Sequence, residues 1–228
     1  MIPLFDLAPT RRFALVTYAL IAANVLVFLW ERQAQNVRVE RYAFYPCAVS
    51  GPCTRAARDH LPWAEGALSS LFLHASWWHL GGNMLFLFIF GNNVEDVMGR
   101  LRFLVFYVCS GFAAALSQAW VTLHYAGVHA ASVPNVGASG AIAGVLGAYV
   151  VLLPHARVIA LLGFLPLPFS ALFFIGLWFA LQLWQAGFSV TDPGSGGGVA
   201  FAAHVGGFLF GVLAVRVFQV RPPLGLRR

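Results

Sequence analysis

The sequence predicts an all-α fold, a polytopic membrane bundle of six transmembrane helices. Hydrophobic residues make up 60% of the 228 residues and charged residues only 10%, against roughly 25% charged in ordinary globular domains. The mean hydropathy is +0.77. About 20 apolar residues cross a bilayer, so a chain of this length allows roughly six spans with connecting loops.

The six predicted spans form one membrane domain over 13–220, between short tails at 1–12 and 221–228. They cover residues 13–30, 79–91, 101–123, 137–153, 170–186 and 199–220. Pro154 ends the fourth span, an apolar stretch broken by prolines precedes the fifth, and a Gly-rich turn at 191–198 precedes the sixth. A long polar loop over 31–70 follows the first span.

The arginines predict how the bundle sits in the membrane. All 14 basic residues are Arg, and five of them lie in the 31–70 loop beside four acids. With the N-terminus inside, the other nine are cytoplasmic, as the positive-inside rule requires. Both tails are then cytoplasmic and 31–70 is extracytoplasmic. The net charge of +6 is thus explained by the orientation of the chain in the membrane. We therefore expect no nucleic-acid partner. Short tails and an early acid, Asp6, favour a bacterial inner membrane over the alternative of an organelle membrane.

Four of the polar residues inside the apolar spans stand out as functional candidates, because polar groups are costly there. His79 and Asn83 are in the second span, Ser139 in the fourth and His204 in the sixth. Because these three spans all enter from the outside, His79, Ser139 and His204 fall at similar depth in one leaflet. The topology therefore predicts a single site.

The residue types at this site predict acyl-transfer chemistry. A Ser hydroxyl becomes a nucleophile when a neighbouring base takes its proton, and His is the usual base. Ser139 and His204 are the candidate pair. Ser139 also stands at a predicted helix start, where backbone N–H groups are free to bind an oxyanion. His79 and Asn83, spaced i and i+4, present two further donors on one helix face.

Small residues predict close packing of the fourth and sixth spans. Gly140 and Gly144 form one GxxxG pair, and Gly207 and Gly211 form another. Such pairs let helix backbones touch. His204 and Gly207 share a face, so this contact would bring the His204 ring to the fourth span.

Three sequence blocks then resemble those of rhomboid intramembrane serine proteases. Residues 71–83, which lead into the second span, read Leu71-Phe-Leu-His74-Ala-Ser-Trp-Trp-His79-Leu-Gly-Gly-Asn83, like the family's second-helix H-x-x-x-N pattern. Residues 137–140 read Gly-Ala-Ser-Gly, like its G-x-S-G, and 203–207 read Ala-His-Val-Gly-Gly, like its A-H-x-x-G. The resemblance covers roughly residues 10–220.

The resemblance implies a rhomboid-like six-helix bundle with a water-filled cavity open to the outside. It implies a catalytic dyad of Ser139 and His204, with His79, Asn83 and the Ser139 N–H as the oxyanion hole. His74, Gly137 and Gly140 match positions at the cavity. Substrates would be single-span membrane proteins cut in the bilayer, and no cofactor or metal is expected. The fifth span and the 191–198 loop match the family's gate and cap.

The sequence departs from a well-studied bacterial branch of that family in two places. The first long loop has Arg41-Tyr42 where that branch has a Trp-Arg pair, and a position that supports the catalytic His also differs. There an aromatic residue four positions after the catalytic Ser packs on the His ring, and here that residue is Ala143.

Rival readings remain beside the protease. One is an inactive rhomboid-like protein that binds membrane clients, although such a protein would be expected to lack the Ser or the His. Another is a small transporter, although its ionisable residues would line a path through the bilayer. The sequence has no H-E-x-x-H motif and no acid inside a span, which disfavours zinc and aspartyl intramembrane proteases.

Other side chains are given structural expectations. Asp192 lies in an Asp-Pro-Gly turn, where Asp is common, so we expect no catalytic role. Glu95 and Asp96 are expected to pair with Arg100 or Arg102 or to cap their loop. Cys47 and Cys53 would form a disulfide only on an oxidising side, and this pairing stays open, as does the oligomeric state.

Overall fold

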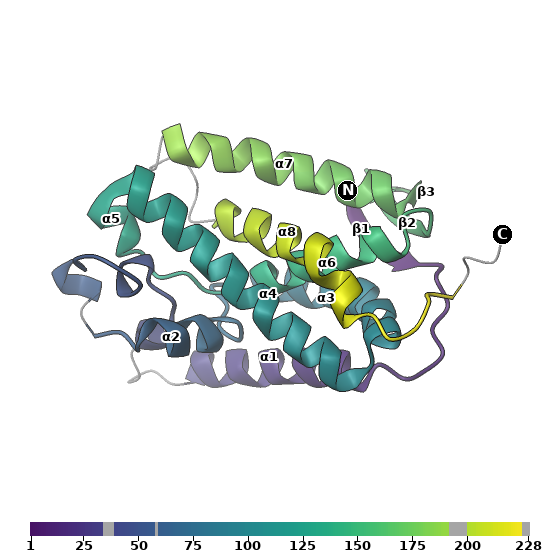
Figure 1. The fold of residues 1–228 in the computed structure, drawn as a ribbon, viewed down its shortest axis with the longest axis horizontal. Coiled ribbons are helices and arrows are strands. Elements are labelled where there is room, and N and C mark those ends of the chain that lie inside the picture. The colour runs from purple at the N-terminus through teal and green to yellow at the C-terminus, as the bar shows by residue number, and fades with distance from the viewer. Residues whose placement is uncertain (34–38, 58, 192–199, 225–228) are drawn as a thin grey trace.

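The computed structural model describes residues 1–33, 39–57, 59–191 and 200–224. Within them the chain forms a bundle of long helices with a small sheet at one end and short helices at the other (Figure 1). The long helices are α1 (Leu15–Gln33), α3 (Trp77–Met98), α4 (Arg100–Val121), α6 (Ser139–Leu152), α7 (Ala171–Thr191) and α8 (Phe201–Phe218). The short helices are α2 (Trp63–Ser70) and α5 (Gly127–Ala131), with a π-helical turn over Thr122–Ala126 and 3-10 turns at Val39–Tyr42, Pro46–Ala48 and Arg55–Ala57.

Helix α6 is the centre of the bundle and packs against α3, α4 and α8. It is buried on every side, with Ala143, Val145 and Ala148 at 0% exposure. A helix that is apolar all round is stable only inside a protein or a membrane. Apart from Ser139 and Tyr149, α6 consists of Gly, Ala and aliphatic residues, so its neighbours approach its backbone closely. In Figure 1, α1 and α7 run along opposite edges of the bundle.

The sheet is a feature that the sequence analysis did not predict. Strand β2 (Arg157–Leu162) pairs antiparallel with β3 (Leu165–Ser170) and, on its other side, with β1 (Ile2–Asp6). The apolar stretch before α7 cannot be helical because β3 has proline at 166 and 168. Proline donates no ladder hydrogen bond, and β3 is accordingly an edge strand. Residues expected to form a plain N-terminal tail thus take part in the fold.

The predicted helical membrane bundle is confirmed, while the number of spans stays a prediction. Three described helices are long and apolar enough to cross a membrane, namely Leu15–Gln33, Arg100–Ala131 and Phe201–Phe218. Ser139–Leu152 and Ala171–Gly187 are shorter apolar helices. The 14 residues of α6 cover only about 21 Å at a rise of 1.5 Å per residue.

The loop expected between the second and third spans is almost absent. Helix α3 continues through Glu95 and Asp96, and Gly99 alone separates it from α4. Gly99 has a φ of +77°, a left-handed conformation that Gly adopts without strain. The 31–70 loop likewise contains α2 and three short 3-10 turns rather than unstructured chain.

The acids at the end of α3 bind the N-terminal segment, and the expected pairing with Arg100 or Arg102 is wrong. Asp96 Oδ2 forms an ion pair with Arg11 Nη1 at 2.9 Å. Glu95 accepts hydrogen bonds from the Val16 N–H at 3.0 Å and from the Thr17 N–H at 2.7 Å. These amides belong to the first turn of α1, whose N–H groups have no partner within the helix. A carboxylate at a helix N-terminus is stabilising, so Glu95 serves as the cap of α1.

Candidate active site

One cavity of about 620 Å³ contains all four polar span residues that the sequence singled out. Its wall comes from the start of α3, the loop before α6, the start of α6, α7 and the start of α8. His79, Asn83, Ser139 and His204 all line it. His79 and His204, which are 125 positions apart in the chain, therefore line one cavity, as their common depth in the bundle predicts.

Ser139 and His204 are in direct hydrogen-bond contact. Ser139 Oγ lies 2.8 Å from Nε2 of His204. Ser139 is the first residue of α6, so its backbone N–H lies in the turn that has no intrahelical acceptor. His204 stands in the first turn of α8. The Ser139 hydroxyl, the His204 base and the unpaired Ser139 N–H thus lie together at the cavity. Nucleophilic catalysis requires this arrangement.

The glycines of α6 and α8 account for this close approach. A Cβ on Gly207 would collide with the carbonyl oxygen of Gly140, and a Cβ on Gly211 would collide with that of Gly144. On the other side of α6, a Cβ on Gly144 would also meet the Ser110 hydroxyl of α4. Backbone-to-backbone contact of this kind is possible only between small residues.

The His79 ring packs directly against Gly137, which is not itself among the residues that line the cavity. A Cβ on Gly137 would lie 2.7 Å from His79 Cε1, and the residue has a φ of +124°, which favours Gly. Any side chain at Gly137 would therefore displace the His79 ring.

His74 does not line the cavity but binds Asn83, which does. Nδ2 of Asn83 lies 2.9 Å from Nε2 of His74, and the two side chains are 8% and 5% exposed. Burial lowers the pKa of His74 to about 4, and nearby His79 acts in the same direction. A neutral His74 accepts from the Asn83 amide, which leaves His74 as a support of Asn83 rather than a cavity wall.

The sequence analysis missed two residues at this site, and both come from α7. Gln182 is 9% exposed, and its Oε1 lies 2.5 Å from Nδ1 of His204. The centroid of the Trp178 ring lies 5.9 Å from that of the His204 ring. An aromatic ring therefore lies beside His204 although residue 143 is Ala. Gln182 carried a readable signal, because it is a polar residue inside a predicted span.

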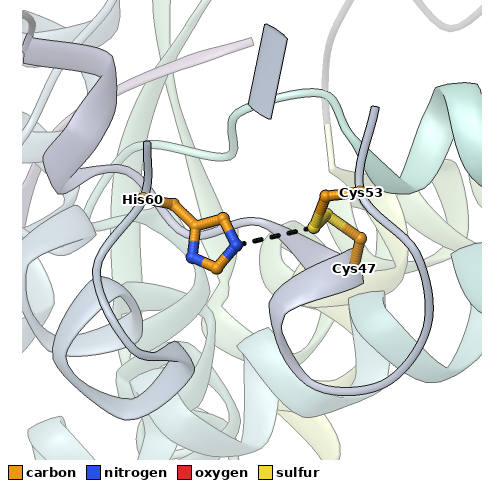
Figure 2. Close-up of side chains that lie close together, drawn as sticks. All are labelled: Cys47, Cys53 and His60. Carbon is orange, nitrogen blue, oxygen red and sulfur yellow. Dashed lines mark hydrogen bonds between the residues drawn. A yellow bond between two sulfur atoms is a disulfide. The ribbon is translucent and has the colours of Figure 1, made fainter. Parts of the chain in front are cut away.

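A second cluster of potential ligand atoms lies in the 31–70 region, away from the cavity. Figure 2 shows His60 pointing at the bonded sulfurs of Cys47 and Cys53. His60 Nε2 lies 3.5 Å from Cys53 Sγ. The pairing of these two cysteines, which the sequence left open, is therefore a disulfide. Disulfide sulfurs are not thiolates, and a metal ion is bound by the thiolate form of cysteine. Asp192 and most of the Gly-rich turn lie outside the described residues.

Comparison with known proteins adds family evidence to this geometry. The Rhomboid domain family model matches residues 63–220. Rhomboid protein 1, mitochondrial, of Saccharomyces cerevisiae is 32% identical over 206 residues, which cover 87% of this chain and 51% of the yeast protein. Presenilin-associated rhomboid-like protein, mitochondrial, of Homo sapiens is 30% identical over 216 residues, covering 90% of this chain and 50% of the human protein.

The aligned part of these relatives is about half of their own length. RHOMBOID-like protein 1 of Arabidopsis thaliana is 32% identical over 156 residues, which cover 68% of this chain and 34% of the plant protein. The yeast and human relatives are named as mitochondrial, so they lend no support to the expected bacterial inner membrane. Because the family model matches well over half of the chain, and membrane-spanning helices accompany it, this integral membrane protein belongs to the rhomboid family.

Proposed function

We propose that the chain is an intramembrane serine endopeptidase that cuts single-span membrane proteins in or near their membrane segment. The observation that carries the proposal is the 2.8 Å contact between Ser139 Oγ and His204 Nε2 inside the cavity. A serine that served only to pack helices together would need neither a base beside it nor a cavity in front of it. Rhomboid family membership supports the same reaction class.

In the proposed reaction Ser139 Oγ attacks the carbonyl carbon of the scissile peptide bond, while its proton passes to His204 Nε2. The C–N bond then breaks as the imidazolium returns that proton to the leaving amine. An acyl-enzyme on Ser139 remains. Water, deprotonated by His204, attacks the ester carbonyl and releases the new carboxyl end and the Ser139 hydroxyl.

The developing oxyanion would be bound by the Ser139 N–H, His79 and Asn83. All three residues line the cavity, and the Ser139 N–H is free of intrahelical bonding. Donors fixed in a site of this kind are worth about 3 kcal/mol each in related reactions. His74 would keep the Asn83 amide in place through their 2.9 Å contact.

The proposal includes the orientation of the protein, with both tails on the cytoplasmic side. Arg11 and Arg12 before α1, Arg100 and Arg102 in the first turn of α4, and Arg221 after α8 would lie on that side. The cavity would then open on the opposite side, because α6 and α8 begin there.

The test is cleavage of a generic single-span reporter in liposomes by the parent protein, Ser139→Ala and His204→Ala. The matched controls are Ser50→Ala and His124→Ala, because both residues are exposed and neither lines the cavity. We expect both dyad variants to lose roughly a thousandfold or more in rate and both controls to match the parent.

Cleavage that survives Ser139→Ala would reject Ser139 as the nucleophile. Absence of cleavage by the parent on several reporters would instead favour a rhomboid-like protein that binds membrane clients without cutting them.

A further inference from the structure

We propose that Gln182 is a positioning residue, which holds His204 in the one neutral tautomer that can accept the Ser139 proton. The inference rests on the proposed function, since it assigns His204 the task of general base. It adds a third member to the pair and places that member on α7, a different helix from the other two.

The hydrogen bonds on the two sides of the His204 ring define the arrangement. Nε2 faces Ser139 Oγ at 2.8 Å and Nδ1 faces Gln182 Oε1 at 2.5 Å. An amide oxygen accepts hydrogen bonds and cannot donate them. Nδ1 therefore carries the ring proton, and Nε2 presents its lone pair to the Ser139 hydroxyl, which donates.

The partner of one ring nitrogen decides which tautomer a neutral His adopts. The other tautomer would carry the proton on Nε2, donate it to Ser139 and leave the hydroxyl without a base. Gln182 thus selects the reactive form before substrate arrives. When the Ser139 proton reaches Nε2, Oε1 keeps its bond to Nδ1–H, and that bond becomes charge-assisted and stronger.

A neutral amide suits this place better than a carboxylate. Among the described residues, the lining of the cavity contains no Asp or Glu. Gln182 is 9% exposed, and a charge buried at membrane depth is costly. The amide orients the ring without that cost.

Two further contacts join α7 to the first half of α8. Trp178, one turn before Gln182, lies 5.9 Å from the His204 ring between centroids. Phe179 stacks on Phe208 with centroids 4.1 Å apart. The position of α7 therefore determines whether His204 is oriented, and outward movement of α7 would withdraw the acceptor from Nδ1.

The test compares Gln182→Met with Gln182→Glu in the reporter assay. Met has nearly the same length and offers no strong acceptor, whereas Glu keeps an acceptor oxygen in either protonation state. We expect Gln182→Met to lower kcat roughly ten- to a hundredfold with KM unchanged, and Gln182→Glu to stay within a few-fold of the parent. Leu181→Ala is the control, since Leu181 is the preceding residue and 52% exposed.

The ring nitrogens of ¹⁵N-labelled His204 give a second readout, with the signal assigned by its loss in His204→Gln. We expect a protonated Nδ1 and an unprotonated Nε2 in the parent and a mixture in Gln182→Met. A parent spectrum with the proton on Nε2, or a folded Gln182→Met with the parent's kcat, would overturn the inference. The spectrum is readable in a protein that cleaves nothing, so failure of the proposed function is a separate result.

Discussion

Gly207 packs directly on the backbone carbonyl of Gly140, and this contact sets the distance between the two residues of the candidate dyad. Gly140 follows Ser139 in α6, and Gly207 stands one turn after His204 in α8. A wider separation of the helices would move the His204 ring away from the hydroxyl that now lies 2.8 Å from it. The geometry of the site thus depends on glycine, which has no side chain, at positions 140 and 207.

Gly207→Ala should therefore impair both stability and activity. The added methyl would overlap the Gly140 carbonyl and force α8 outward, and overpacking of this kind costs about 1–3 kcal/mol. We expect a lower melting temperature in detergent and a lower cleavage rate. Gly176→Ala on α7 is the control, because a Cβ there meets nothing within 4 Å. Equal behaviour of the two variants would contradict the packing account.

The contact between Asp6 and Tyr149 should make stability depend on pH. The Tyr149 hydroxyl donates to Asp6 Oδ2 at 2.6 Å and joins β1 to α6. Burial raises the pKa of Asp6 above 3.8, and the hydrogen bond opposes this only in part. The folded state therefore holds the Asp6 proton more tightly than the unfolded state does. Stability from this group is present below pH 3.8 and is lost as pH rises through the raised value.

Asp6→Asn keeps the acceptor and removes the charge. We expect its melting temperature to rise relative to that of the parent between about pH 4 and about pH 7. If the difference in melting temperature between Asp6→Asn and the parent stayed constant over that range, the pKa of Asp6 would not be raised in the folded protein.

The cap that Glu95 provides to α1 should contribute to stability and not to catalysis. Glu95 also accepts from the Thr17 hydroxyl at 2.8 Å, in addition to the two backbone amides. Glu95→Gln removes the charge at the helix start, and we expect a loss of about 1–2 kcal/mol. Chemical unfolding measures the loss, and the cleavage rate of the folded protein should remain at the parent value. An unchanged unfolding midpoint would refute the capping role.

The disulfide between Cys47 and Cys53 can be tested by alkylation, because the chain has three cysteines. In denaturant without reductant, we expect a thiol reagent to modify Cys109 alone, since it is the free cysteine. After reduction all three should react. Full modification without prior reduction would mean that the two sulfurs are not bonded in the protein as isolated.

The long helices and the residues of the cavity were readable from the sequence because each stands out against an apolar background. Ser139, His204, His79 and Asn83 are polar residues in apolar runs, and their common depth follows from counting spans. The family resemblance and the structure bring the same four residues to one cavity. Their chemical roles stay proposals.

The parts that the sequence did not reveal depend on contacts between distant segments. Strand β1 pairs with residues more than 150 positions away, and no local pattern signals that partner. The ion pair of Asp96 with Arg11 spans 85 positions, while the nearer Arg100 was the obvious candidate by sequence alone. Gln182 could have been found by the rule that found Ser139, but its partner becomes evident only when α7 is seen beside α8.

The most direct measurement is labelling of the parent protein with a fluorophosphonate probe, with the modified residue identified by mass spectrometry. Such a probe reacts with a serine that a neighbouring base activates. The account predicts an adduct on Ser139 in the parent and none in His204→Ala. An adduct on another serine, or an equal yield on Ser139 without His204, would contradict the proposed dyad.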